Sequence, residues 1–458
     1  MLKRWLALAV TLFLVGAPLA AQDPEPKKGQ HGRLLLISLD ALRPEAYLEE
    51  RFGMTNLRAL AARGVQAKKC VGVFPTLTYP SHTSIVTGTR PAVHGVVSNW
   101  IFDPKDGGKR WYFEEAHMHA TPLWTAAKRA GLTTCVVHWP VTLGSTQIDW
   151  HVPEINVKGE DDLEAMRKGS TPGLMEEVWP KDPGKDEPGI DAASTAAVCA
   201  IIEKHAPELL VLHLLQADGA QHHAGREDPE VLAAFARLDG CLGAILRSLE
   251  KAGVLDQTNI IVTGDHGMID VHTAVKPNAL LRELGFLRAD ERGKFLDWTA
   301  CANTGGASAA IYARDPADKA TSERVVQAFK SAAASRYRGI FNVLDRDALD
   351  REEAFPGAIC AIEGEPGYCM ETDPLGGVLG VAHVKGNHGY MPDRDEVATG
   401  LVAAGPGIAK ARTIAGFRMI DVAPLAAHLM GISLGPGVEG VLIPGVLAPA
   451  RKERVDDH

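Results

Sequence analysis

The feature of this sequence that most constrains its fold is a regular alternation of short apolar segments with helix-like segments. Residues 34–38 (LLLIS) and 209–215 are almost entirely apolar, as expected for strands that are buried on both faces. Helices are predicted at residues 55–63, where Gly64 provides the stop signal, and at residues 229–252. This alternation predicts an α/β fold with a mostly parallel central sheet and helices on both faces.

The rest of the chain continues the pattern, with two interruptions. Further strands are predicted at residues 133–137, 259–263 and 399–404, and further helices at residues 122–130, 192–205 and 421–430. Residues 141–190 are rich in charge, Pro and Gly, and are predicted to form a long surface excursion. Residues 268–380 are predicted to form a small α+β insertion over the sheet. The core would then comprise residues 32–267 and 381–446, followed by a C-terminal tail, residues 447–458.

The N-terminus has the pattern of an export signal. Lys3 and Arg4 precede an apolar run at residues 5–15 and a small-residue zone at residues 17–21. We therefore predict a signal peptide, residues 1–21, and a flexible Pro-rich leader, residues 22–31. An uncut membrane anchor is the alternative, but the apolar run is short for a span. The protein is expected to be secreted or periplasmic, with no transmembrane helix in the mature chain.

Charge and cysteine content narrow the function classes. The net charge of −9 is opposite to that of a nucleic-acid-binding surface, so no nucleic-acid polymer is expected as a partner. No C-x-x-C pair occurs among the seven cysteines, which disfavours a thiolate metal cluster. In an oxidising compartment, Cys360 and Cys369 are the predicted disulfide pair, and the odd count leaves at least one free thiol.

Acidic and imidazole side chains follow several predicted strands. Ligands of open α/β sheets gather at the carboxyl ends of strands. Mixed carboxylate and imidazole ligands suit Zn(II), with Mn(II) or Fe as alternatives, and six ligands divide into two sites of three. The six candidate metal ligands are Asp40, Asp218, His222, Asp265, His266 and His388.

A candidate nucleophile lies in the segment FPTLTYPSHTSIVTG. Pro80 suits the first turn of a helix that runs to Thr87, which puts Thr78 at the helix N-terminus. Backbone N–H groups and the positive helix end favour a phosphate there, and a metal ion would activate the hydroxyl. By spacing alone, Thr76 is a rival candidate.

These motifs resemble the type I phosphodiesterase/nucleotide pyrophosphatase family of the alkaline phosphatase superfamily. The resemblance rests on FPTLTYPSHTSIVTGTRPAVHGVVSN, TPLWTAAKRAGLTTCVVHWP, DGAQH, GDHGM and GNHGY, in the family's order. It covers roughly residues 33–270 and 380–445 and implies an alkaline phosphatase-like fold.

The resemblance also implies roles for individual residues. Thr78 would attack phosphorus from between two zinc ions and form a threonyl-phosphoryl intermediate. Asn99 would donate a hydrogen bond to a phosphoryl oxygen. One zinc would be held by Asp218, His222 and His388, and the other by Asp40, Asp265 and His266.

The sequence departs from the family pattern near the expected substrate pocket. The family usually carries Asn before the histidine at position 82, where this chain has Ser81. Tyr79 follows the nucleophile and is predicted either to stack on a nucleobase or to pack in the core. Lys385 is a candidate replacement for the basic residue that phosphomonoesterases of the superfamily place near phosphate. The predicted substrate contacts are Tyr79, His82, His383 and Lys385.

The sequence therefore predicts a secreted zinc-dependent phosphodiesterase or nucleotide pyrophosphatase. Its partner would be a small phosphoester, with a nucleotide as one candidate. One alternative is a phosphomonoesterase or phosphonate hydrolase of the same superfamily. An alternative of another class is a non-catalytic, zinc-stabilised binding protein, but all predicted ligands and the nucleophile are present.

Overall fold

The computed structural model describes residues 32–103, 108–156 and 159–449. The predicted signal peptide, the predicted leader and residues 450–458 of the predicted tail lie outside this part of the chain. Within the described ranges, no helix has both the length and the apolar character needed to cross a membrane.

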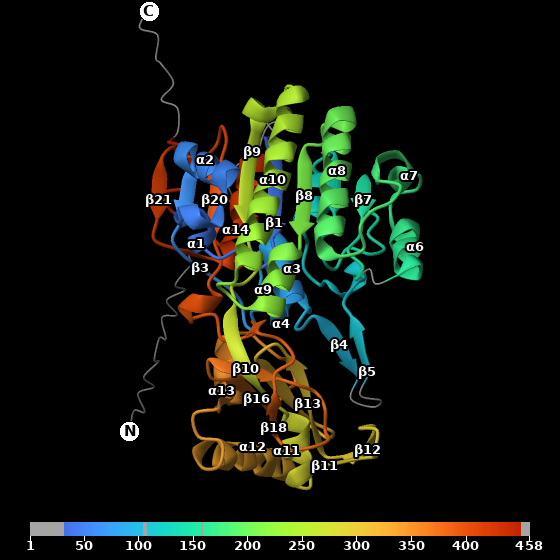
Figure 1. Ribbon diagram of the computed structural model, residues 1–458, viewed down its shortest axis with the longest axis vertical. Coiled ribbons are helices and arrows are strands. Elements are labelled where there is room, and N and C mark those ends of the chain that lie inside the picture. The colour runs from blue at the N-terminus through green and yellow to red at the C-terminus, as the bar shows by residue number, and fades with distance from the viewer. Residues whose placement is uncertain (1–31, 104–107, 157–158, 450–458) are drawn as a thin grey trace, which may run out of the picture.

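An eight-stranded sheet forms the centre of the molecule (Figure 1). Five neighbouring strands run parallel, and β20 is antiparallel to the strands beside it. The predicted mostly parallel sheet is therefore confirmed. In spatial order the strands are β21 (Arg412–Ile414), β2 (Val65–Ala67), β20 (Leu401–Ala404), β9 (Thr258–Thr263), β1 (Arg33–Leu39), β8 (Leu209–Leu214), β6 (Thr134–Val137) and β7 (Trp150–Val152).

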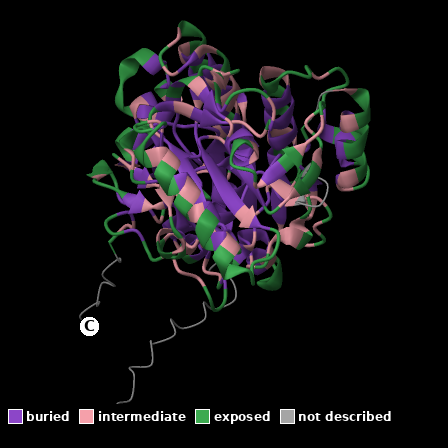
Figure 2. Cartoon of the chain, turned by 90° about the horizontal axis from the view of Figure 1, so that it is seen from below, coloured by how far each residue is buried: buried purple, intermediate pink, exposed green. Residues whose placement is uncertain are grey.

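Successive side chains of each buried strand alternate between two apolar clusters, so both faces of the sheet are apolar. Helices cover both faces and bury these side chains. Leu35 and Ile37 of β1 face one cluster, whereas Leu34 and Leu36 face the other. Figure 2 shows the strands buried between helices with exposed outer surfaces. The first cluster includes α2 (Thr55–Arg63), α8 (Glu187–His205) and α10 (Pro229–Lys251), and the second includes α3 (Thr78–Thr87), α5 (Leu123–Arg129) and α14 (Val422–Met430).

The prediction that residues 141–190 form a surface excursion is wrong in part, because the segment contributes to the central sheet and its core. It contributes the edge strand β7 and two helices, α6 (Glu160–Gly169) and α7 (Leu174–Val178). Leu163 and Leu174 from these helices join the first apolar cluster. The segment contains many charged residues, and only a few apolar residues in its helices reach the core. Composition alone therefore indicates a surface segment.

Residues 268–380 contain a second, antiparallel sheet with its own apolar cluster, which includes Phe329 and Phe341. This unit lies beyond the carboxyl ends of the central strands rather than over a face of the sheet (Figure 1). Its sheet has the order β13 (Ala300–Gly305), β14 (Ser308–Ala313), β16 (Cys360–Gly364) and β15 (Phe341–Leu344), and its helices are α11 (Pro277–Glu283), α12 (Lys319–Ala334) and α13 (Arg346–Arg351).

Short elements connect this unit to the core. Strand β10 (Ile269–Val275) leaves the core and pairs with β19 (Gly386–Asn387), which returns to it. The remaining elements are distributed over the core and the second unit. They are α1 (Glu45–Leu48), β3 (Cys70–Val71), α4 (Pro91–His94), β4 (Trp100–Asp103), β5 (Gly108–Trp111), α9 (Gln216–Ala224), β11 (Leu287–Ala289), β12 (Phe295–Trp298), β17 (Gly367–Met370), β18 (Leu379–Val381) and β22 (Phe417–Arg418).

The seven cysteines all lie in the described ranges, and each is unpaired. The predicted bridge between Cys360 and Cys369 is therefore wrong. Cys360 packs in the apolar cluster of the second sheet, whereas Cys369 packs in a separate small cluster with Ile269 and Tyr390. Proximity in sequence suggested the pair, but the two side chains point into different cores.

Candidate active site

Thr78 is the first residue of α3, directly after the extended Leu77. Its side chain is largely buried, at 9% exposure, and lines a pocket of about 510 Å³. The Oγ1 atom lies 3.4 Å from Nε2 of His266. Thr78 therefore presents a hydroxyl from the positive end of a helix to one of the predicted metal ligands.

Thr76, the rival candidate for the nucleophile, has a different position. Its side chain is fully buried, and its hydroxyl donates to the carbonyl of Tyr390 at 3.0 Å while accepting from the N–H of Gly389 at 3.0 Å. The carbonyl of Thr76 also accepts a hydrogen bond from Nδ1 of His388 at 2.9 Å. Thr76 thus holds the segment around His388 in place and does not line the pocket.

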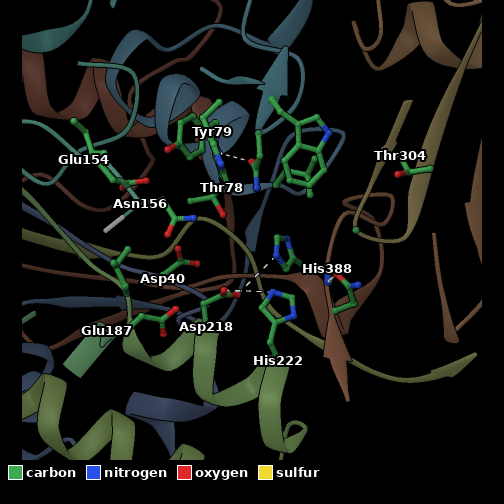
Figure 3. Close-up of a pocket in the computed structure, with 18 of the residues that line it drawn as sticks. Asp40, Thr78, Tyr79, Glu154, Asn156, Glu187, Asp218, His222, Thr304 and His388 are labelled. Carbon is green, nitrogen blue, oxygen red and sulfur yellow. Dashed lines mark hydrogen bonds and ion pairs between the residues drawn. The ribbon is translucent and has the colours of Figure 1, made fainter. Parts of the chain in front are cut away.

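Asp218, His222 and His388 come together as predicted, with one ligand atom of each within 4.8 Å of the others. Asp218 and His222 lie one turn apart on α9, with Nε2 of His222 3.3 Å from Oδ2 of Asp218. His388 follows β19, and its Nε2 lies 3.8 Å from Oδ1 of Asp218. Figure 3 shows these three side chains pointing toward one another inside the pocket.

Asp40, Asp265 and His266 also meet, at the ends of β1 and β9. Nε2 of His266 lies 3.4 Å from Oδ1 of Asp40 and 3.2 Å from Oδ2 of Asp265. A second group of possible ligands joins Asp40 and His266 to Asp218, so the two predicted triads adjoin. This agrees with the rule that ligands gather at the carboxyl ends of parallel strands.

The three histidines are oriented as metal ligands usually are. Each directs Nδ1 at a backbone carbonyl: His222 at Gly386 (2.7 Å), His266 at Gly267 (3.0 Å) and His388 at Thr76 (2.9 Å). Because a carbonyl can only accept, Nδ1 carries the hydrogen and the lone pair of Nε2 faces the carboxylates. Hydrogen bonds of this kind fix the tautomer and orientation of metal-ligating histidines.

The carboxylates also fit a cation site. One oxygen of each has no hydrogen-bond partner among the described residues, namely Oδ1 of Asp40, Oδ1 of Asp218 and Oδ2 of Asp265. Unpaired carboxylate oxygens are costly inside a protein unless a cation neutralises them. The residues present therefore fit the binding of divalent cations.

Electrostatics support the same interpretation. Burial, followed by repulsion from Asp265 and Asp218, raises the pKa of Asp40 well above its usual value. Burial lowers the pKa of His388 well below its usual value, and electrostatic repulsion from the imidazoles of His266 and His222 lowers it further. His388 and His266 stack at a ring separation of 3.5 Å, an arrangement suited to neutral rings. Neutral imidazole is the form that binds a metal.

Asn99 and Tyr79 line the pocket beside Thr78. Oδ1 of Asn99 accepts a hydrogen bond from the N–H of Tyr79 at 3.0 Å, which leaves the amide NH₂ group as its donor. The Tyr79 ring is only 1% exposed and packs 5.3 Å from the ring of Trp111. The geometry therefore favours packing in the core as the role of Tyr79 over stacking on a nucleobase.

The other predicted substrate contacts do not line this pocket. His82 is fully buried beneath it, where Nδ1 contacts the carbonyl of Thr78 at 2.8 Å and the ring packs against Trp139. His383 and Lys385 are exposed, and Nε2 of His383 lies 3.6 Å from Glu371. All three lie close in sequence to predicted ligands or to Thr78, but closeness in sequence does not determine where a side chain points.

Several residues that line the pocket are not predicted by any sequence motif. Glu154 and Asn156 follow β7, and Glu187 begins α8, so all three come from the segment predicted as a surface excursion. Burial, with repulsion from Asp218 and Asp191, raises the pKa of Glu187 to about 8. These residues carry no motif. Glu154 and Asn156 reach the pocket because they follow the last parallel strand, β7, and Glu187 reaches it from the first turn of α8.

Comparisons with known proteins identify the family to which this chain belongs. A model of the type I phosphodiesterase / nucleotide pyrophosphatase family matches residues 34–391. Human ectonucleotide pyrophosphatase/phosphodiesterase family member 7 is 23% identical over 454 residues, which cover 93% of this chain and 85% of that protein. Human family member 1 is 30% identical over 246 residues, which span 51% of this chain but only 23% of that protein.

A solved structure has the same fold. It is an inactive variant of murine ectonucleotide pyrophosphatase/phosphodiesterase 5, in which a threonine is replaced by alanine, in complex with AMP. The TM-score is 0.65 at 20% identity, over 89% of this chain and 96% of that chain. With a family model that covers most of its length and an alkaline phosphatase-like fold, this chain belongs to the type I phosphodiesterase/nucleotide pyrophosphatase family.

Proposed function

We propose that this protein is an exported phosphodiesterase or nucleotide pyrophosphatase that uses two Zn(II) ions and Thr78 as the nucleophile. The observation that carries the proposal is the position of the Thr78 hydroxyl. It lines one pocket together with Asp40, Asp218 and His388, and its Oγ1 lies 3.4 Å from Nε2 of His266. Of the described hydroxyl side chains that line this pocket, only that of Thr78 belongs to the first residue of a helix.

The two triads would hold the ions, with Asp218, His222 and His388 around one and Asp40, Asp265 and His266 around the other. When bound, such ions supply Lewis acidity that favours the ionised form of a hydroxyl or of water and balances charge on a phosphoryl group. Zn(II) is the proposed metal because imidazole and carboxylate ligands suit it.

The protein's own groups then position the reaction. Thr78 forms a bond from Oγ1 to phosphorus while the bond from phosphorus to the leaving oxygen breaks and that oxygen takes up a proton. The product is a threonyl-phosphoryl intermediate that keeps the remaining ester group of the substrate. Water afterwards displaces Thr78 and restores the hydroxyl. Asn99 is oriented by the N–H of Tyr79, so its NH₂ group is free to donate to a phosphoryl oxygen as charge develops there.

A diester or pyrophosphate is the proposed substrate class. Lys185 is the only cationic side chain among the described residues that line the pocket, so a doubly charged monoester finds little extra neutralisation there. Two half-buried indole rings, Trp100 and Trp111, form part of the pocket wall. They offer an apolar surface for a nucleobase, in keeping with the AMP bound in the murine relative.

The test compares purified wild type with Thr78→Ala on bis(p-nitrophenyl) phosphate, p-nitrophenyl phosphate and ATP. We expect wild type to prefer the diester and to release AMP and pyrophosphate from ATP. Thr78→Ala should lose turnover by at least about 10³-fold, since it lacks the nucleophile, yet keep its zinc.

Thr87→Ala on the same helix is the matched control, because its hydroxyl bonds only within α3 and to Thr89. It should keep the wild-type rate. A faster rate on the monoester would overturn the substrate class and leave the metal site standing. Full activity of Thr78→Ala would overturn the nucleophile, and zinc binding with no turnover of any substrate would favour a binding protein.

A further inference from the structure

A second set of metal-binding side chains lies beside the two triads. His138, Glu154 and His213 are all buried, and one ligand atom of each lies within 4.8 Å of the others. His213 is the penultimate residue of β8, His138 follows β6 and Glu154 follows β7. The group therefore gathers at the carboxyl ends of three adjacent parallel strands. None of the three is assigned to the triads.

His138 is the side chain that points to a missing partner. It is 2% exposed, yet neither ring nitrogen has a hydrogen-bond partner among the described residues. A buried polar group left without a partner destabilises the folded protein. The residue also has a φ of 55°, in the left-handed region that non-glycine residues rarely adopt. Backbone strain of this kind clusters at functional sites.

His213 links this group to the predicted catalytic metals. Its Nε2 lies 3.2 Å from Oδ2 of Asp40, and its Nδ1 lies 2.8 Å from Oε2 of Glu154. With Nε2 donating to Asp40, the lone pair of Nδ1 faces Glu154 and His138. A carboxylate that orients a histidine for metal binding is a recurrent arrangement. Here that carboxylate, Asp40, is itself a predicted ligand through its other oxygen.

We propose that His138, Glu154 and His213 bind a third divalent transition-metal ion, of the Zn(II), Mn(II) or Fe(II) class. Two imidazoles and one carboxylate are a common ligand set for these ions. Three protein ligands leave a coordination position open. Since His138 and Glu154 line the pocket, that position is accessible to an anionic oxygen of a substrate or to water.

A proton shared between His213 and Glu154 is the competing account of the cluster. It would satisfy these two side chains but would leave both nitrogens of His138 without a partner. A metal ion would replace that proton and would also bind one nitrogen of His138. The two accounts therefore differ in the number of ions that each chain binds.

The experiment counts metal ions on the full-length protein. Wild type, stripped with a chelator and dialysed against Zn(II), should bind three ions per chain by plasma mass spectrometry. His138→Ala should bind two, because it lacks one ligand of the third ion only. Glu154→Gln, which keeps the side-chain shape, should also bind two. Thermal melting of each variant shows that it is folded.

His151→Ala is the matched control, because His151 is a buried histidine of the neighbouring strand β7 that does not belong to the cluster. It should still bind three ions. Wild type with two ions, or His138→Ala with three, would overturn the third site. Diesterase activity of the wild type is measured in parallel. An active protein with two ions would reject this inference while leaving the proposed function intact.

Discussion

At the residue scale, the geometry of the site depends on groups that carry no sequence signature. The ligand histidines were predicted from their motifs, but the carbonyls that orient them belong to Gly386, Gly267 and Thr76. Any residue type has a carbonyl, so no pattern could identify these partners. Metal affinity commonly falls 10–100-fold when such supporting contacts are lost. A local sequence motif therefore predicts which residue is a candidate ligand, whereas backbone groups that no motif identifies set the orientation of its side chain.

His94 provides a residue-scale prediction about pH. Its ring is fully buried, with Nδ1 accepting from the N–H of Val96 at 3.2 Å and Nε2 3.0 Å from Oγ of Ser84. Burial lowers the pKa of His94 from 6.5 to about 3. Unfolding lets the ring take up a proton below pH 6.5, so the stability contributed by the neutral ring is present above that pH and is lost as the pH falls toward 3. At pH 5 the loss is about 2 kcal/mol.

Urea unfolding of wild type and His94→Asn at pH 7 and pH 5 measures this loss. Asn can still accept from the N–H of Val96 but does not titrate, so the variant should lose about 2 kcal/mol less than wild type between the two values. His428→Asn, at an exposed position, should behave like wild type. Equal losses for wild type and His94→Asn would contradict the assignment.

At the element scale, the turn between β13 and β14 contacts the segment that carries His388, a proposed metal ligand of the core. The N–H of Ala307 donates to the carbonyl of His388 at 2.7 Å. A Cβ on Gly306 would lie 2.1 Å from the same carbonyl oxygen. Only glycine allows so close an approach between the second sheet and the segment that carries His388. This unit is thus part of the site's framework.

Gly306→Ala should therefore displace His388 and reduce metal content and diesterase rate by about tenfold or more. The matched control is Gly339→Ala in the same unit. Gly306 and Gly339 both have positive φ angles, 58° and 74°, but nothing lies within 4 Å of a Cβ on Gly339. Both variants bear the backbone cost of about 1 kcal/mol, but only Gly306→Ala should lose metal. Equal metal contents would show that the turn does not support His388.

At the scale of the whole molecule, the central strands converge on a concentration of negative charge. Asp40, Asp218 and Asp265 lie together, and each has an oxygen without a hydrogen-bond partner in the described part of the chain. Ions that bind the folded but not the unfolded protein add stability, about 2.7 kcal/mol at a hundred times the dissociation constant. The metals are thus expected to hold the whole fold together as well as to act in catalysis.

Removal of the metals with a chelator should lower the melting temperature by on the order of 5 °C or more, which calorimetry measures. Zn(II) should restore the melting temperature, whereas Mg(II), which prefers oxygen ligands, should not. Asp265→Ala is the comparison, because it should show a smaller shift on chelation than wild type. A melting temperature that does not respond to chelation would mean that the carboxylate cluster is stable without ions.

The sequence by itself determined the parallel core and the helix that begins at Thr78, and it predicted the candidate metal ligands. These depend on local patterns: apolar runs of strand length, glycine stops, and acids or histidines directly after strands. The tertiary structure alone decided how the second unit sits beyond the strand ends, that Cys360 and Cys369 face different cores, and that His82 lies beneath the pocket. It also decided that Glu154 and His138 meet His213. Such contacts join residues far apart in the chain, and only the order in which the strands assemble brings them together.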